Sequence, residues 1–294
     1  MAASKPAWER PVIIDFHTHI FPPQVRDRRE RYVERDATFG LLFAGPGARM
    51  ATAEELVQAM DEDGVDVSVA MGIGWTDRGV ARDCNDYIVE STARYPDRLV
   101  GFAGVNPAWG DEAAREADRC AAAGLRGIGE LHPDSQGFNL GDAGTMSPLM
   151  EVVRERGLVL TTHSSEPVGH AYTGKGATRP EVLWRFIQGF PDATVVLAHW
   201  GGGLPFYALM PEVAAALGNV YFDTAASPFL YRPEVFAAVA SLVGADRILM
   251  GSDFPLLRAR RLLKQAADSP LPQGQRDAIS GANASRLLGL LPSP

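Results

Sequence analysis

Eight short runs of apolar, β-favouring residues recur along the chain, and each is followed by a longer segment with helical spacing. The runs are PVIIDF, VDVSVAMG, RLVGFAGV, GLRGIGEL, GLVLTTH, ATVVLAH, NVYFDT and RILMGSD. They are nearly continuous in apolar residues rather than alternating, which is typical of parallel strands buried on both faces. Helix candidates lie between them at residues 53–63, 111–123 and 146–156. The pattern therefore indicates a series of βα units.

The number of these units favours one α/β architecture over another. Eight βα repeats can close into a barrel, whereas an open doubly wound sheet usually has about five to seven strands. The chain length of 294 residues suits one such barrel, which typically takes about 250 residues. We therefore predict a single-domain (β/α)8 TIM barrel over residues 1–294, with an open sheet as the alternative.

The interval after the first run is longer than the others and predicts an insertion at residues 20–52. It contains a charged stretch, RDRRERYVERD, and then a Gly/Pro-rich piece, FAGPGARM. A charged stretch is usually a solvated surface. However, this insertion leaves from the C-terminal end of strand one, which is the face where barrel enzymes carry their active sites. The alternative interpretation is a lid that supplies Arg49 to an anionic substrate.

Composition argues against several classes of protein. The formal net charge of -8 is unfavourable for sequence-independent binding to nucleic acid, which needs clustered cations. No stretch approaches the roughly 20 apolar residues of a membrane span, and the first residues lack the apolar core of a secretory signal. Cys84 and Cys120 form neither a disulfide framework nor a CxxC metal motif. We expect a cytoplasmic protein that acts on a small molecule.

Five of the six histidines lie at or just beyond the end of a predicted strand. His17 and His19 end the first run, and side chains two residues apart on a strand share a face. Both imidazoles can therefore point into the barrel mouth, which is a metal-ligand arrangement. His163 and His199 end the fifth and sixth runs and would project into the same volume.

Acidic residues also occur at predicted strand ends. Asp253 follows the eighth run and could be a metal ligand, a general base or both, although turn residues of this kind are common. Glu130 and His132 share one face of the fourth strand. A carboxylate buried inside a barrel costs several kcal/mol unless it is paired or coordinated. We therefore consider Glu130 a metal ligand or a bridge between two metals, and His132 a metal or substrate contact.

The loop EPVGHAYTGKGATRP after the fifth run is long for a βα connection. It offers His170, Tyr172, Lys175 and Arg179 to an anionic substrate group. The alternative interpretation is a solvated loop without a role in binding.

Several of these pieces occur together in one known superfamily. The segments DFHTHIFPP, GIGELHPDSQGF, TTH, AHWGGGLPF and GSDFP, with AISGANASRLLGL at the end, resemble the amidohydrolase superfamily. The resemblance covers about residues 12–291 and is closest to the amidohydrolase-related branch that includes aminocarboxymuconate semialdehyde decarboxylase. It implies a metal-dependent TIM barrel, and a homodimer is an expectation based on the family alone.

The resemblance also implies roles for individual residues. His17, His19, His163 and Asp253 match residues that bind a divalent ion, usually zinc, with manganese also accepted. His199 matches either a further ligand in two-metal members or an acid/base residue in one-metal members. Many members of this branch have lysine at the position of Glu130, so the role of that residue stays open, and with it the choice between one ion and two.

Two reactions are compatible with these residues. Our main hypothesis is hydrolysis of an amide, ester or lactone, because zinc lowers the pKa of bound water to roughly 7. Asp253 would accept the proton of this water, and His199 would polarise the carbonyl or bind a second ion. The alternative is non-oxidative decarboxylation of a small aromatic or unsaturated acid, with His199 or Asp253 delivering a proton to carbon. A non-catalytic metal-binding barrel is the third hypothesis.

Two features of the site would separate hydrolysis from decarboxylation. A second metal at Glu130 would favour hydrolysis. A single metal with an arginine or lysine facing the site would favour decarboxylation.

Overall fold

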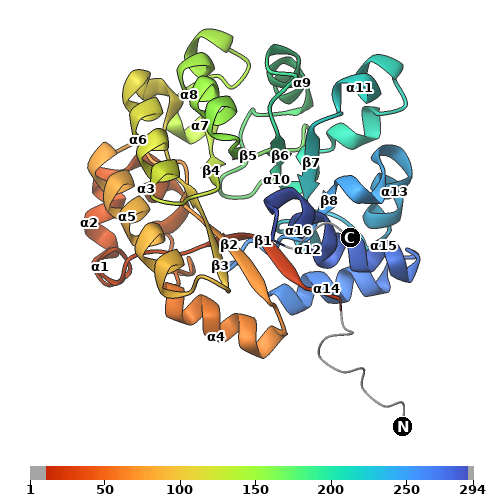
Figure 1. Cartoon of the computed structure of the whole chain (residues 1–294), viewed down its shortest axis with the longest axis horizontal. Coiled ribbons are helices and arrows are strands. Elements are labelled where there is room, and N and C mark those ends of the chain that lie inside the picture. Colours follow the sequence, from red (N-terminus) through yellow and green to blue (C-terminus); the bar gives the residue numbers. More distant parts are fainter. Residues whose placement is uncertain (1–10, 291–294) are drawn as a thin grey trace.

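A computed structural model describes residues 11–290, which form a barrel of eight parallel strands in sequence order (Figure 1). Each predicted run supplies one strand. The strands are β1 (Ile14–His19), β2 (Val67–Met71), β3 (Leu99–Ala103), β4 (Gly127–Leu131), β5 (Val159–Thr162), β6 (Val195–Leu197), β7 (Val220–Asp223) and β8 (Ile248–Leu249).

Backbone hydrogen bonds join the last strand region to the first. Thr18 forms a parallel bridge with Phe254, and the Phe16 amide donates to the Met250 carbonyl at 2.7 Å. An open sheet would leave these groups at two free edges. The predicted (β/α)8 TIM barrel is therefore confirmed, and the open-sheet alternative is wrong.

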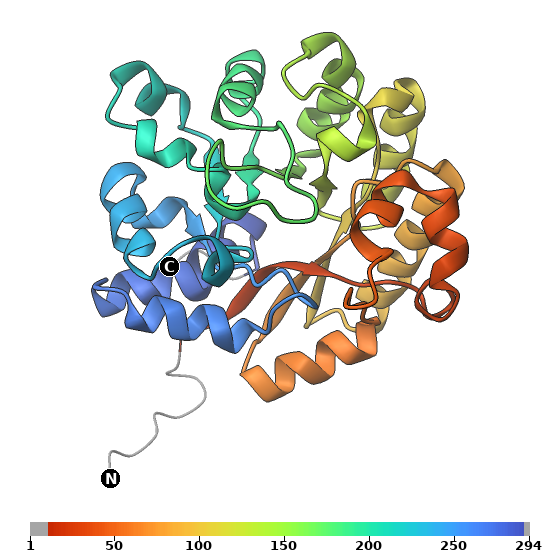
Figure 2. The same cartoon turned by 180° about the vertical axis from the view of Figure 1, so that it is seen from behind.

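Helices surround the strands, as both views show (Figures 1 and 2). They are α1 (Pro23–Asp27), α2 (Arg29–Arg35), α3 (Ala37–Phe43), α4 (Ala53–Asp63), α5 (Arg78–Arg94), α6 (Asp111–Ala122), α7 (Pro133–Gln136), α8 (Ala143–Arg156), α9 (Pro180–Gly189), α10 (Ala198–Gly201), α11 (Pro211–Ala216), α12 (Ser227–Leu230), α13 (Glu234–Val243), α14 (Ala259–Asp268), α15 (Gln273–Asp277) and α16 (Asn283–Leu288). No helix in residues 11–290 is long and apolar enough to cross a membrane.

Local sequence explains where the helices begin and end. Helix α4 starts with a capping box in which Thr52 accepts from the Glu55 amide, and it stops at Gly64, whose φ of 72° is left-handed. Helix α8 begins earlier than predicted because Asp142 caps it by accepting from the Gly144 amide. Gly144 and Pro148 conceal the helical pattern in that first part of the sequence.

The barrel interior is filled by large apolar side chains from several strands. Phe16 of β1 and Phe102 of β3 meet edge to face, with their ring centroids 5.7 Å apart, and Met71 and Val196 pack in the same cluster. Leu288 of α16 also belongs to this cluster. The barrel interior is therefore a solid apolar core, and α16 packs against it. The polar residues lie at the C-terminal ends of the strands, at the other end of the barrel.

The insertion after β1 forms the three helices α1, α2 and α3. Its charged stretch forms α2, in which Tyr32 is buried and most other side chains are exposed or partly exposed. Helix α3 is held by aromatic packing, since Phe39 stacks on Phe43 at 4.9 Å and on Trp75 at 6.1 Å between centroids. The insertion is therefore an ordered part of the barrel mouth.

Candidate active site

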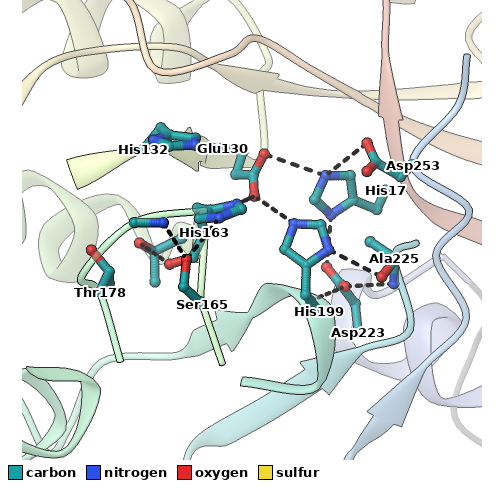
Figure 3. A network of polar contacts seen from close by, with 12 residues as sticks. His17, Glu130, His132, His163, Ser165, Thr178, His199, Asp223, Ala225 and Asp253 are labelled. Atoms are coloured by element: carbon teal, nitrogen blue, oxygen red, sulfur yellow. Dashed lines mark hydrogen bonds and ion pairs between the residues drawn. The ribbon is translucent and has the colours of Figure 1, made fainter. Parts of the chain in front are cut away.

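Side chains from the ends of β1, β4, β5, β6 and β8 converge at one end of the barrel (Figure 3). His17 and His19 bring their Nε2 atoms to 3.1 Å from one another. His163 and His199 lie beside them, with ring centroids 4.7 Å apart. All four imidazoles are buried. The sequence-predicted histidine cluster therefore forms as expected.

Glu130 lies at the centre of these imidazoles. Its Oε2 atom is 3.6 Å from Nε2 of His17 and 3.8 Å from Nε2 of His19. Its Oε1 atom is 3.2 Å from Nδ1 of His163 and 3.4 Å from Nε2 of His199. Each carboxylate oxygen thus faces one pair of imidazoles, which places this residue within the cluster of possible ligands.

Asp253 approaches the cluster from the end of β8. Its Oδ1 atom is 3.4 Å from Nε2 of His19 and 3.9 Å from Nε2 of His17. Its backbone φ is 67°, and the φ of His199 is 55°. Left-handed conformations are uncommon in residues other than glycine and often mark functional sites.

The donor set fits a divalent cation. Two groups, His17/His19/Glu130 and Glu130/His163/His199, each have ligand atoms within 4.8 Å of one another. Imidazole and carboxylate are the side chains that bind first-row divalent metals. Without a cation, the buried carboxylates would need protonated imidazoles as partners, and burying all of these charged groups has a high desolvation cost. A divalent metal centre is therefore supported, and the donors do not distinguish zinc from other ions.

Charges within the cluster shift the protonation of its members. Burial raises the pKa of Glu130, but the imidazoles of His17, His163 and His199 outweigh burial and hold that pKa well below its ordinary value. Burial lowers the pKa of His199, but Glu130 outweighs it and raises that pKa to about 9. Glu130 is therefore an ionised acceptor, and a bound cation would displace protons from the imidazoles.

The pKa of His132 is shifted in the opposite direction from those of His17 and His199. Burial, and then the neighbouring His163, lower its pKa to about 3. Its ring stacks on His163 with 4.2 Å between centroids, and its Nδ1 lies 2.9 Å from the Ser135 hydroxyl. The buried Nε2 has no hydrogen-bond partner. His132 is thus a neutral side chain at the cavity wall.

Two buried aspartates position the cluster and were missed by the sequence reasoning. Asp223 Oδ2 accepts from Nδ1 of His17 at 2.8 Å, and Oδ1 accepts from the His199 amide at 3.1 Å. Asp15 accepts from the Ser252 amide and hydroxyl. A carboxylate on Nδ1 orients a ligating imidazole. Asp223 ends the run NVYFDT, and that strand-end position was the available signal.

A cavity of about 430 Å³ opens above the cluster. His19, Glu130, His132, His163, His199 and Asp253 form its polar part. Leu42, Phe43, Ile73, Phe229, Leu230 and Leu256 form its apolar part. Arg49, from the segment after α3, and His170, from the loop after β5, also line it. The cavity is therefore an apolar chamber with metal-ligand side chains and a nearby guanidinium group.

Lys175 does not line this cavity, although the sequence suggested that it would contact the substrate. Its Nζ atom donates to the carbonyl oxygens of Val168 at 2.7 Å and His170 at 3.0 Å. These bonds hold the ammonium group within its own loop. Arg179 precedes α9 and is exposed, and it is not among the residues that line the cavity.

The family model for amidohydrolases matches residues 14–290. The chain belongs to the amidohydrolase family. This amidohydrolase-family chain is 23% identical to the 2-amino-3-carboxymuconate-6-semialdehyde decarboxylase of Dictyostelium discoideum, over 97% of the chain and 93% of that protein. It is 24% identical to the 6-methylsalicylic acid decarboxylase of Penicillium expansum, over 95% of the chain and 98% of that protein.

Solved structures show the same fold. The 5-carboxyvanillate decarboxylase of Sphingomonas paucimobilis superposes with a TM-score of 0.76 at 19% identity, covering 95% of this chain and 99% of that one. A dihydroxybenzoic acid decarboxylase of Polaromonas sp. JS666, solved with manganese and the inhibitor 2-nitroresorcinol, gives 0.74 at 19% identity, with 97% and 98% covered. The expected resemblance to the decarboxylase-containing branch is confirmed.

These comparisons correct our main functional prediction. Hydrolysis was favoured because a metal site of this kind can activate water, but the relatives and the structural neighbours above are decarboxylases. The prediction of a hydrolase is therefore wrong, and the decarboxylase alternative is better supported. The ligand set did not separate the two reactions because the same side chains can hold a metal for either one.

Proposed function

We propose that this chain is a metal-dependent decarboxylase of a small aromatic carboxylic acid. The observation that carries the proposal is the 430 Å³ cavity, in which apolar walls adjoin the cluster of metal-ligand side chains. An aromatic ring fits walls of this kind, while its carboxylate needs a cation. The decarboxylases named above support the same reaction class.

The chain provides a distinct set of residues for the metal. His17, His19, His163 and Asp253 are the proposed ligands, with Glu130 between the two imidazole pairs. Nδ1 of His17 donates to Asp223, and Nδ1 of His199 faces the Ala225 carbonyl at 3.0 Å. Both rings are thereby held with Nε2 turned toward Glu130 and available for a ligand.

A divalent ion bound by these residues would supply positive charge for an anionic substrate. Phe43, Ile73 and Leu230 surround the aromatic ring and exclude water. Arg49 attracts the anionic acid into the cavity. Loss of carbon dioxide breaks a carbon–carbon bond and leaves an electron pair on the ring carbon, which then takes a proton.

Asp253 is the proposed carrier of this proton. Its side chain is 16% exposed, compared with 7% for His199 and 9% for Glu130, so its carboxyl group is the most accessible of the three. It lines the cavity, so it would take a proton from solvent water and pass it to the ring carbon. His199 then acts as a ligand or as a hydrogen-bond donor, and its Nδ1 is already engaged.

The ion is proposed to be manganese or zinc. Manganese is bound in the Polaromonas structure, and zinc is the expectation from the sequence. Both accept imidazole and carboxylate ligands. Elemental analysis of the purified protein, expressed without added metal, identifies the ion and gives the number of ions per chain. A homodimer and a cytoplasmic location stay predictions from the sequence.

Release of carbon dioxide from hydroxylated benzoic acids tests the proposed reaction. The protein is stripped with a chelator and reloaded with Mn²⁺ or Zn²⁺, and each form is incubated with a panel of these acids. We expect release only from the loaded forms, and its loss in Asp253→Asn. A loaded, folded protein that consumes none of the acids, or that releases carbon dioxide equally well without metal, would contradict the proposal.

A further inference from the structure

A second cavity, of about 360 Å³, lies beside the candidate active site. It is an open cavity lined by the loops that follow β5, β6 and β7, and the first of these is the long green loop across the middle of Figure 2. His170, Tyr172 and Leu230 line both cavities. The reaction proposed above uses no side chain that is confined to this second cavity.

A buried carboxylate lines the second cavity. Glu166 is 9% exposed, and its Oε2 atom accepts from the Tyr172 hydroxyl at 2.9 Å. The other oxygen, Oε1, is buried without any hydrogen-bond partner. Within residues 11–290, no arginine, lysine or histidine forms an ion pair with Glu166. In this part of the chain its hydrogen-bond donor is the Tyr172 hydroxyl, so the cavity wall carries a carboxyl group with no cationic side chain paired to it.

Lys175 lines the same cavity but does not neutralise Glu166. Its Nζ atom is held by the Val168 and His170 carbonyls and lies 5.5 Å from the centroid of the Tyr172 ring. These contacts are on the exposed side of the loop, where solvent screens the charge. Lys175 is therefore held within its own loop and leaves Glu166 without a cationic partner in the described part of the chain.

Aromatic side chains provide part of the remaining walls. Phe206 and Tyr231 lie with ring centroids 6.3 Å apart, and Tyr172 and Tyr207 complete the set. Phe206 is 44% exposed and Tyr207 is 49% exposed, which is high for such large rings. The faces of aromatic rings attract cations, and cages of this type recognise organic ammonium groups.

We propose that the second cavity binds the ammonium group of a small organic cation, with Glu166 as its counter-charge and the aromatic rings as its walls. This proposal does not depend on the decarboxylase reaction. Because Tyr172 and His170 also line the first cavity, an occupant of the second cavity would lie directly beside the active site.

Titration with choline tests the ligand class, since choline carries a quaternary ammonium group of suitable size. The control ligand is 3,3-dimethyl-1-butanol, which has the same shape without the charge. Binding is followed by calorimetry and by NMR shifts of the purified, folded protein. We expect choline to bind at least about tenfold more tightly than the neutral analogue.

Two variants test the assigned residues. Glu166→Gln keeps the side-chain shape and should weaken choline binding by about tenfold or more, because the counter-charge is lost. Lys175→Met removes a like charge and should leave binding unchanged or make it tighter. Thermal unfolding verifies that both variants are folded, and Glu166→Asp, which retains the charge, should recover part of the affinity if Glu166→Gln is destabilised.

Several results would overturn the proposal. Equal binding of choline and the neutral analogue would mean that the cavity recognises shape alone. Unchanged choline affinity in folded Glu166→Gln would show that Glu166 is not the counter-charge. No detectable binding by the wild-type chain would show that the cavity is not a site for organic cations. A loss of choline binding in Lys175→Met as large as in Glu166→Gln would also contradict the assigned charges.

Discussion

At the scale of single residues, Asp223 shows how a side chain outside the cavity can control the site. It is fully buried and holds both the His17 ring and the His199 backbone. Its carboxylate therefore determines which nitrogen of His17 faces Glu130 and any bound ion. Carboxylates in this position commonly strengthen metal binding by orienting the ligand.

Asp223→Asn should weaken metal binding by roughly 10–100-fold, because an amide is a poorer acceptor for Nδ1 of His17. Competition with a fluorescent chelator measures the affinity. The matched control is Asp246→Asn, whose side chain is 65% exposed, and its affinity should not change. If both variants bind metal as the wild type does, Asp223 has no positioning role.

Arg49→Met should raise KM for an aromatic acid and leave metal content unchanged, because Arg49 lines the cavity and its guanidinium is proposed to attract the substrate anion. We expect a loss of about tenfold in kcat/KM, which corresponds to an activation free energy higher by about 1.4 kcal/mol. Steady-state kinetics of the metal-loaded enzyme measures the effect. Arg31→Met, on the exposed face of α2, is the matched control, and an equal loss in that variant would contradict the assignment.

At the scale of elements, the insertion α1–α3 contributes one wall of the cavity through α3 and the segment that follows it. Phe39 of α3 is fully buried among Phe21, Phe43 and Trp75. This packing carries Leu42 and Phe43 to the cavity. The charged stretch itself forms the mostly solvated helix α2, while the segment after α3 places Arg49 at the site.

Phe39→Ala should destabilise the protein by about 3–5 kcal/mol, because it leaves a void inside the aromatic cluster. It should also raise KM, since the wall formed by Phe43 loses its support. Chemical denaturation and steady-state kinetics measure the two effects. Leu41→Ala on the same helix removes a side chain that is 49% exposed and should change stability by less than about 0.5 kcal/mol.

At the scale of the whole molecule, barrel closure brings residues from positions 17 to 253 into one buried cluster. The Asp253 amide donates to the His17 carbonyl at 2.9 Å, so the last strand end is bound directly to the first. The apolar core lies below this cluster and includes Phe16, Phe102 and Leu288. The core and the metal centre are therefore separate layers of one barrel.

Removal of the metal should lower the unfolding temperature without abolishing the fold, because the core does not contain the ligands. The stabilisation by a bound ion rises by about 1.4 kcal/mol for each tenfold excess of the ion over its Kd. Calorimetry of stripped and reloaded protein measures this shift, and circular dichroism follows the secondary structure. Complete unfolding on chelation would show that the metal is required for folding.

The sequence by itself determined the barrel and most of its candidate metal ligands. Runs such as GLVLTTH and RILMGSD show both a buried strand and the polar residue that ends it, because strand periodicity and strand ends are local properties. His17, His19, His163, His199, Glu130 and Asp253 could therefore be selected before any tertiary contact was known.

Only the tertiary structure decided which of these side chains contact one another. The arrangement of Glu130 between two imidazole pairs, the support from Asp223 and Asp15, and the exclusion of Lys175 depend on distances between remote segments. The second cavity likewise forms from three separate loops. Local patterns contain no information on such contacts, because the barrel register and the loop packing that create them are set by the closed fold as a whole.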